Sequence, residues 1–228
     1  MSASPLLWLT AQVIGWSLLL QCVFGVGLGW LLARRKFKGL QLLEMLLTLP
    51  MVFPPIALGY GLLLLLGRQG WLTQWLPVGI QPDIIFTQAG LVLAAFVAGL
   101  PLMVKPTQTA FASIAPQMRE AAATLGDSPW QVFWRVELGL ARRGLAAGLI
   151  LAGGRALGEV RLSLMLGGNI AGRTETLSLA IYNQVLDGNF DCANQLSLLL
   201  CLIAIPAFVL LRWLGALQQV LREFRVRG

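Results

Sequence analysis

The stretch TAQVIGWSLLLQCVFGVGLGWLLA, residues 10–33, contains no charged side chain. About 20 apolar residues suffice for a helix to cross a bilayer. Further apolar runs cover residues 42–66, 86–104, 140–157 and 196–214. Lipid offers no partners for backbone N–H and C=O groups, so such runs must form helices. The sequence therefore predicts an all-α membrane protein with five transmembrane helices.

The composition supports a membrane protein and argues against several other classes. Of the 228 residues, 57% are hydrophobic and 12% are charged, which is roughly half the charged share of soluble domains. The net charge of +7 comes from short basic clusters beside apolar runs. This placement favours topology signals over nucleic-acid contacts. The sequence has no histidine, and its three cysteines lack metal-ligand spacing, so we expect neither a metal site nor a cofactor.

The distribution of Lys and Arg predicts an orientation. Thirteen of the 17 basic residues follow the first apolar run, follow the third, or lie in the C-terminal tail. Basic loops stay in the cytoplasm, so we expect an external N-terminus and a cytoplasmic C-terminus. The thirteen residues are Arg34, Arg35, Lys36, Lys38, Lys105, Arg119, Arg135, Arg142, Arg143, Arg212, Arg222, Arg225 and Arg227.

Two segments leave alternatives open. Residues 174–186 are moderately apolar but too short to span, which suits a sixth element that is buried, re-entrant or half-crossing. The second apolar run contains Pro50, Pro54 and Pro55. These prolines predict either a tolerated kink or a bend beside a substrate path.

The connection from residue 105 to residue 143, within a single domain of residues 1–228, predicts two short helices. Pro116 suits a first helical position, and Gly126 suits a left-handed helix end. Asp127 or Ser128 can cap a second helix that has Pro129 in its first turn. The connection is then either a lid on the protein's own core or a docking element for a soluble partner. In the second helix one face holds Trp130, Phe133, Trp134 and Leu138.

This connection resembles the signature of binding-protein-dependent ABC importer permeases, which reads E-A-A, three residues, G, nine residues, I, one residue, L-P. The chain has Glu120-Ala121-Ala122, then Gly126, and then Val136, Leu138 and Gly139. The isoleucine is conservatively replaced, and glycine stands in place of the final proline.

Other segments are similar to molybdate-type permeases of this family. Residues 48–55 resemble L-P-x-V-x-P-P, and residues 101–105 resemble P-L-M-V-R. Arg155 to Glu159 match R-A-L-G-E, and residues 168–174 resemble G-N-I-P-G-R-T. Residues 160–163 depart from the usual F-G-A-T. The compact length also fits, because sulfate-type relatives tend to be longer.

The resemblance implies the permease subunit of an importer in the bacterial inner membrane, with molybdate as its substrate. Tungstate and sulfate remain alternatives. The implied partners are a second copy of the chain, two cytoplasmic ABC ATPase subunits, an extracytoplasmic substrate-binding protein and membrane lipid. The chain lacks a G-x-x-x-x-G-K-[ST] phosphate loop, so ATP is expected on the ATPases. The implied ATPase-coupling residues are Glu120, Ala121, Ala122 and Gly126.

Candidate pathway or mouth residues lie mainly near the predicted outer face: Pro50, Pro54, Pro55, Gly158, Glu159, Asn169 and Arg173. Arg155 and Glu159 are four residues apart, which favours a helical ion pair over a ligand site. For Arg173, an ordinary external turn and an anion contact both remain open.

Two rival classes of function find less support. An intramembrane enzyme would need a nucleophile with its base, but Ser163 and Ser178 have no histidine or paired carboxylate beside them, so we expect no catalytic residue. A self-sufficient channel or secondary transporter would show charges inside the spans or inverted repeats, and neither is clear.

Overall fold

The computed structural model describes residues 3–35, 38–68, 70–75 and 83–226, and for residues 210–226 it describes the backbone alone. Lys36 and Arg227, which entered the count of basic residues, lie outside these ranges. Throughout the described part, the regular structure is helical, as the apolar runs predict.

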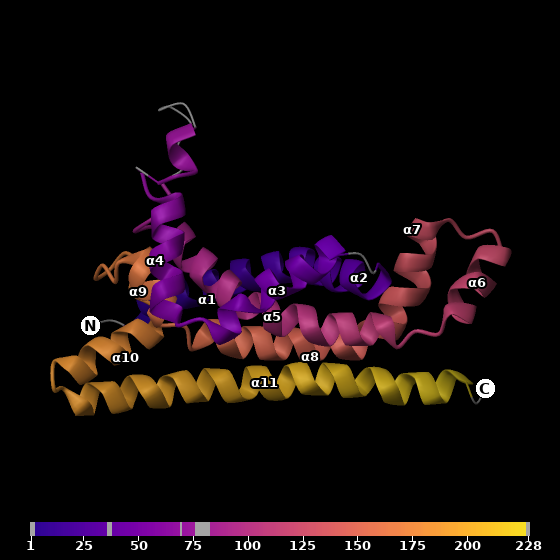
Figure 1. Cartoon of the computed structure of the whole chain (residues 1–228). Helices are drawn as coiled ribbons and strands as arrows, with labels where there is room; N and C mark the ends of the chain where they lie inside the picture. Colours follow the sequence, from indigo (N-terminus) through magenta and orange to yellow (C-terminus); the bar gives the residue numbers. More distant parts are fainter. Residues whose placement is uncertain (1–2, 36–37, 69, 76–82, 227–228) are drawn as a thin grey trace.

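Long helices lie side by side and form a bundle (Figure 1). The first runs without a break from α1 (Ala3–Leu20) through the π-helical turn η1 (Gln21–Gly25) into α2 (Val26–Arg34). The others are α3 (Lys38–Val52), α4 (Pro55–Leu66), α5 (Gln88–Ala112), α8 (Leu138–Leu157) and α11 (Phe190–Val226). Shorter elements connect them: η2 (Thr73–Trp75), α6 (Pro116–Thr124), α7 (Pro129–Val132), η3 (Phe133–Glu137), α9 (Arg161–Gly167) and α10 (Leu177–Leu186).

The second apolar run forms two helices, so its prolines produce a bend between helices rather than a tolerated kink within one helix. Pro54 takes an extended conformation, with φ −56° and ψ 124°, and Pro55 opens α4. A proline also restricts the residue before it to extended backbone, so two successive prolines end α3. Figure 1 shows that α4 turns away from the line of α3 and α5. The prolines therefore produce a sharp break between helices. Pro50 lies inside α3.

The connection predicted over residues 105–143 is shorter than expected. α5 continues to Ala112, past two internal prolines, and α8 begins at Leu138. The predicted short apolar element is present as α10, and its first residues are buried. The sequence analysis did not predict α9.

α5 is the central helix, and α2 and α8 approach it very closely. A Cβ on Gly29 of α2 would lie 2.6 Å from Thr107 Cγ2 of α5. A Cβ on Gly144 of α8 would lie 2.7 Å from the carbonyl oxygen of Pro106. Gly25 and Gly148 repeat these contacts one helical turn away. Small residues spaced by four positions allow such close approach in membrane helices, where packing rather than water drives association.

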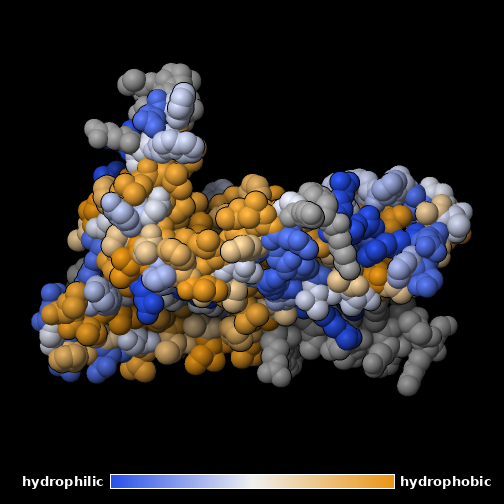
Figure 2. Space-filling model, in the orientation of Figure 1, coloured by the Kyte–Doolittle hydropathy of each residue, from blue (hydrophilic) through white to orange (hydrophobic). Residues whose placement is uncertain are grey.

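Much of the surface is apolar, as expected for a protein in lipid. Figure 2 shows apolar side chains over α4 and the adjoining part of the bundle, whereas hydrophilic side chains gather at the end that carries α6 and α7. By length and composition, residues 4–34 and α5 could each cross a membrane, and several shorter helices are also apolar. The number of crossings and their direction stay predictions.

Gly29 and Gly27 offer a matched pair for testing the close packing, because a Cβ at Gly27 meets no atom within 4 Å. We expect Gly29→Ala to lower the unfolding free energy by about 1–3 kcal/mol, since Thr107 has to move. Gly27→Ala should leave stability equal or slightly higher, because alanine favours helix. Thermal unfolding of the purified chain in detergent measures both. Equal melting temperatures for the two variants would contradict this packing.

Candidate functional site

The turn after α6 has the predicted geometry. Pro116 is the first residue of α6, and Gly126 follows it with φ +91°. The Gly126 N–H donates to the Ala123 carbonyl at 3.0 Å, and the Asp127 N–H donates to that of Ala122 at 3.2 Å. This pair of hydrogen bonds is the glycine-dependent helix ending called the Schellman motif.

The start of α7 also follows the sequence signals. Ser128, rather than Asp127, is the N-cap. The Gln131 N–H donates to Ser128 Oγ, and the Ser128 N–H donates to Gln131 Oε1 at 2.7 Å. Such a reciprocal capping box fixes the direction in which the helix leaves the turn. From Pro129 the chain continues helically through η3 into α8.

α6 presents most of its residues outward. Glu120, Ala121 and Gly126 are exposed, whereas Ala122 is buried against the chain itself. The turn carries Leu125 with 87% of its surface exposed. Beside it Trp130 and Trp134 are 68% and 53% exposed. Trp130 stacks on Phe133, and Trp134 meets Phe133 edge-on. We call the following exposed residues at the hydrophilic end of the molecule the docking face: Met118, Glu120, Ala121, Leu125, Gly126, Trp130 and Trp134.

A buried carboxylate lies behind the docking face. Glu137, at the end of η3, is completely buried, and its Oε2 accepts a hydrogen bond of 2.7 Å from Trp30 Nε1. Its Oε1 pairs with two arginines, Arg34 at the end of α2 and Arg119 of α6, the latter at 2.6 Å. We call these four residues the Glu137 cluster. A buried carboxylate is stable only with such partners.

The sequence interpretation missed this cluster, because Arg34 and Arg119 were counted only as topology signals. Glu137 stands between two apolar residues just before the fourth apolar run. An acid in such a setting requires a buried cation, and this signal could have directed attention to it.

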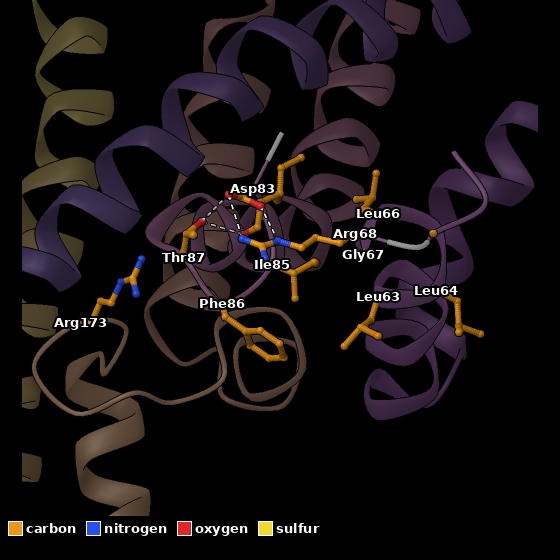
Figure 3. Close-up of a pocket in the computed structure, with 12 residues that line it drawn as sticks. Leu63, Leu64, Leu66, Gly67, Arg68, Asp83, Ile85, Phe86, Thr87 and Arg173 are labelled. Atoms are coloured by element: carbon orange, nitrogen blue, oxygen red, sulfur yellow. Dashed lines mark hydrogen bonds and ion pairs between the residues drawn. The ribbon is translucent and has the colours of Figure 1, made fainter. Parts of the chain in front are cut away.

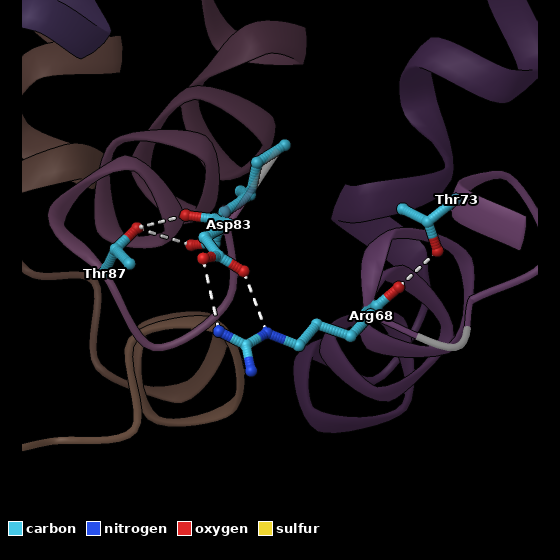
Figure 4. A network of polar contacts seen from close by, with 6 residues as sticks. Arg68, Thr73, Asp83 and Thr87 are labelled. Carbon is cyan, nitrogen blue, oxygen red and sulfur yellow. Dashed lines mark hydrogen bonds and ion pairs between the residues drawn. The ribbon is translucent and has the colours of Figure 1, made fainter. Parts of the chain in front are cut away.

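A cavity of about 770 Å³ opens at the opposite end, between the end of α4 and the start of α5 (Figure 3). Leu63, Ile85 and Phe86 supply apolar parts of its lining. Its polar lining includes Arg68 and Asp83, which form two hydrogen bonds of 2.9 and 3.2 Å. Figure 4 shows this pair beside Thr87, whose hydroxyl donates to the Ile84 carbonyl at 2.7 Å. The pair joins the end of α4 to the residues just before α5.

The contribution of the Arg68–Asp83 pair to stability depends on pH. The hydrogen bond from Arg68 holds the pKa of the exposed Asp83 carboxyl below its ordinary value. The contribution of the pair to stability is therefore present above the ordinary aspartate pKa and is lost as the pH falls through the lowered one.

Arg173 also lines this cavity. Figure 3 shows its guanidinium directed toward Thr87. The side chain is exposed, and no ion pair or hydrogen bond engages it within the described residues. It also borders a second cavity of about 370 Å³, beside α1 and Glu175. Arg173 is thus a free cation at this end of the molecule.

The loop that carries Arg173 is rigidly built. Gly168, Asn169 and Gly172 have φ values of +73°, +50° and +73°. Thr174 Oγ1 accepts from the Ile170 N–H at 2.9 Å and donates to the Gly167 carbonyl. Asn169 exchanges two side-chain hydrogen bonds with Asn183 of α10. Asn169 therefore holds the loop in place rather than facing the cavity.

The ion pair predicted between Arg155 and Glu159 is confirmed. Glu159 is buried, and it also accepts a hydrogen bond of 2.8 Å from the Leu162 N–H at the start of α9. Gly158, beside it, is the C-cap of α8. Glu159 thus joins α8 to α9. Figure 1 shows α6, which carries Glu120, Ala121 and Ala122, at the end of the bundle opposite α9, which follows Gly158 and Glu159.

Comparison with known proteins finds similar permease proteins. The molybdenum transport system permease protein ModB of Haemophilus influenzae is 33% identical over 204 residues, which cover 89% of each chain. ModB of Escherichia coli is 33% identical over 212 residues, covering 92% of this chain and 93% of its own. The sulfate transport system permease protein CysW of Synechocystis is 34% identical over 191 residues, covering 84% of this chain and 69% of its own.

The match to a family extends over most of the sequence. Residues 25–222 match the family described as the inner membrane component of binding-protein-dependent transport systems. The chain belongs to this family and is an integral protein of the inner membrane.

Proposed function

We propose that this chain forms the translocation pathway of an ATP-driven importer for a tetrahedral oxyanion, with molybdate as the substrate. The observation that carries the substrate is the end-to-end match to the ModB permeases, which covers 89% or more of both chains. Two copies of the chain form the pathway, two ATPase subunits bind on the cytoplasmic side, and a binding protein delivers the anion outside.

The distribution of charge supports a cytoplasmic position for the docking face. Arg34, Arg119 and Arg135 belong to the basic clusters and lie at the end with α6 and α7. Exposed apolar groups at a hydrophilic end are typical of a protein contact. Leu125 and the two tryptophans therefore suit a groove on an ATPase, with Glu120, Ala121 and Gly126 at its edge. Ala122, being buried, supports this face from behind.

Movement at the docking face has a continuous route into the bundle. α7, η3 and α8 form one helical run, so a displacement of α7 moves α8 as well. α8 packs against α5 through glycines, which leave little slack. ATP binding would close the ATPases, displace the docking face and open the pathway outward. The anion then enters near Arg173, at the opposite end.

Sulfate is the second candidate substrate, because CysW of Synechocystis is as similar in identity as the ModB proteins. The chain covers 69% of that relative, whereas it covers ModB nearly completely. Length therefore favours molybdate. Tungstate carries the same charge and shape and fits the same proposal.

The substrate prediction is tested by uptake of labelled molybdate, tungstate and sulfate into cells that express the whole transporter. We expect saturable molybdate or tungstate uptake that excess sulfate does not suppress. Arg173→Ala should raise the concentration for half-maximal uptake about threefold, the effect expected for one partly solvated charge-assisted contact. Arg161→Ala, at an exposed site of the same end, is the control. Uptake of sulfate without response to the other two anions would reject the molybdate proposal.

The docking prediction depends on Gly126, whose added Cβ would meet no atom within 4 Å. Gly126→Val should weaken copurification with the ATPase about tenfold, since a β-branched residue resists the left-handed conformation by about 1–2 kcal/mol. Gly126→Asn should bind nearly normally, because asparagine tolerates that conformation. Retention of the ATPase and of transport by the valine variant would argue against docking through this turn.

A further inference from the structure

α6 has few attachments to the rest of the chain. Only Ala122 is buried in this helix, and Arg119 is its only half-buried residue. Arg119 pairs with Glu137 Oε1 at 2.6 Å and donates to the Phe111 carbonyl, near the end of α5, at 3.1 Å. The position of α6 relative to the bundle therefore depends largely on one arginine.

The carboxylate that receives Arg119 is itself held by the first helix. Arg34 pairs with the same oxygen, Oε1, and Trp30 donates to the other oxygen. The Arg34 guanidinium also lies over the Trp30 ring, 5.0 Å from its centroid. Since Glu137 is completely buried, water does not weaken these pairs as it weakens surface pairs. α6, η3 and α2 thus meet at a single carboxylate.

We propose that the Glu137 cluster is a mechanical link that transmits displacement of α6 directly to the end of α2. This link rests on the proposed function, in which an ATPase moves the docking face. It adds a second route for the displacement beside the one through α7 and α8. It also makes α2 move together with α8. Arg119 and Arg34 act in series, because both pair with the same oxygen of Glu137. Both are positioning residues.

A neighbouring ion pair supplies the contrast. Arg135 pairs with Asp127 at 3.1 Å on the same connection, but Arg135 is largely exposed and the pair joins only the turn to η3. Exposed pairs of this kind contribute little. Arg135→Gln is therefore a matched control that removes one arginine from this end without cutting the link to α2.

The test uses the complete transporter reconstituted in lipid vesicles, with ATP hydrolysis and oxyanion uptake measured together. Arg119→Gln and Arg34→Gln should each lower the amount of anion transported per ATP about tenfold, within the range of coupling energies between sites. The double variant should be no worse than either single one, because a series link is already cut. Arg135→Gln should keep the parental ratio.

A purely structural role predicts a different pattern. Uptake and hydrolysis would then fall in proportion, the ratio would stay constant, and the effects of the two arginines would add. A constant ratio of uptake to hydrolysis would overturn the link, and so would additive effects of the two arginines. A parental complex without ATP-dependent uptake would instead refute the proposed function.

A second measurement tests the link without relying on transport. Nitroxide labels at Gln117 of α6 and Arg35 after α2, both exposed, report the distance between the two elements in a chain whose three cysteines are replaced. We expect a narrow distance distribution in the parent and in Arg135→Gln, and a broad one in Arg119→Gln. An unchanged distribution in Arg119→Gln would overturn the proposal.

Discussion

α2 and α8 touch α5 where glycine leaves no side chain between the backbones. In lipid, close packing replaces the hydrophobic effect as the source of helix association. This contact fixes where the ends of α2 and α8 emerge from the bundle, so Arg34 and Glu137 can meet. It likewise fixes the start of α5 beside α9, close to the cavity that Arg68, Asp83 and Arg173 line. Both ends of the molecule therefore depend on the spacing around one central helix.

The charged groups at the two ends of the bundle are arranged differently. At one end Arg34 and Arg119 pair with the buried carboxylate of Glu137. At the other end Arg173 is presented on a loop stiffened by Thr174 and Asn169, and its charge is left available. In the proposed function one end holds a mechanical connection and the other receives the anion. Leu125 and Arg173 are the residues that the proposal assigns to these two roles.

Local signals predicted the turn around Gly126 well, because proline, glycine and serine act on their own backbone. Hydropathy located the long helices, because each apolar run is continuous in the sequence. The spacing of four residues predicted the Arg155–Glu159 pair. The sequence left a kink and a bend at the prolines undecided because membrane helices tolerate single prolines, whereas here two follow each other. Residues far apart in the chain meet in the Glu137 cluster, and in the cavity between Arg68 and Arg173, so spacing along the sequence could not reveal either.

The most direct test of the two-ended account is labelling of single cysteines in intact cells with a membrane-impermeant maleimide. In a background without native cysteines, Arg173→Cys should react from outside, and Leu125→Cys should react only after the cells are permeabilised. Arg161 is exposed at the same end as Arg173, so Arg161→Cys should react from outside as Arg173→Cys does. Reaction of Leu125→Cys in intact cells, with protection of Arg173→Cys, would reverse the orientation and contradict both the docking face and the outer anion site.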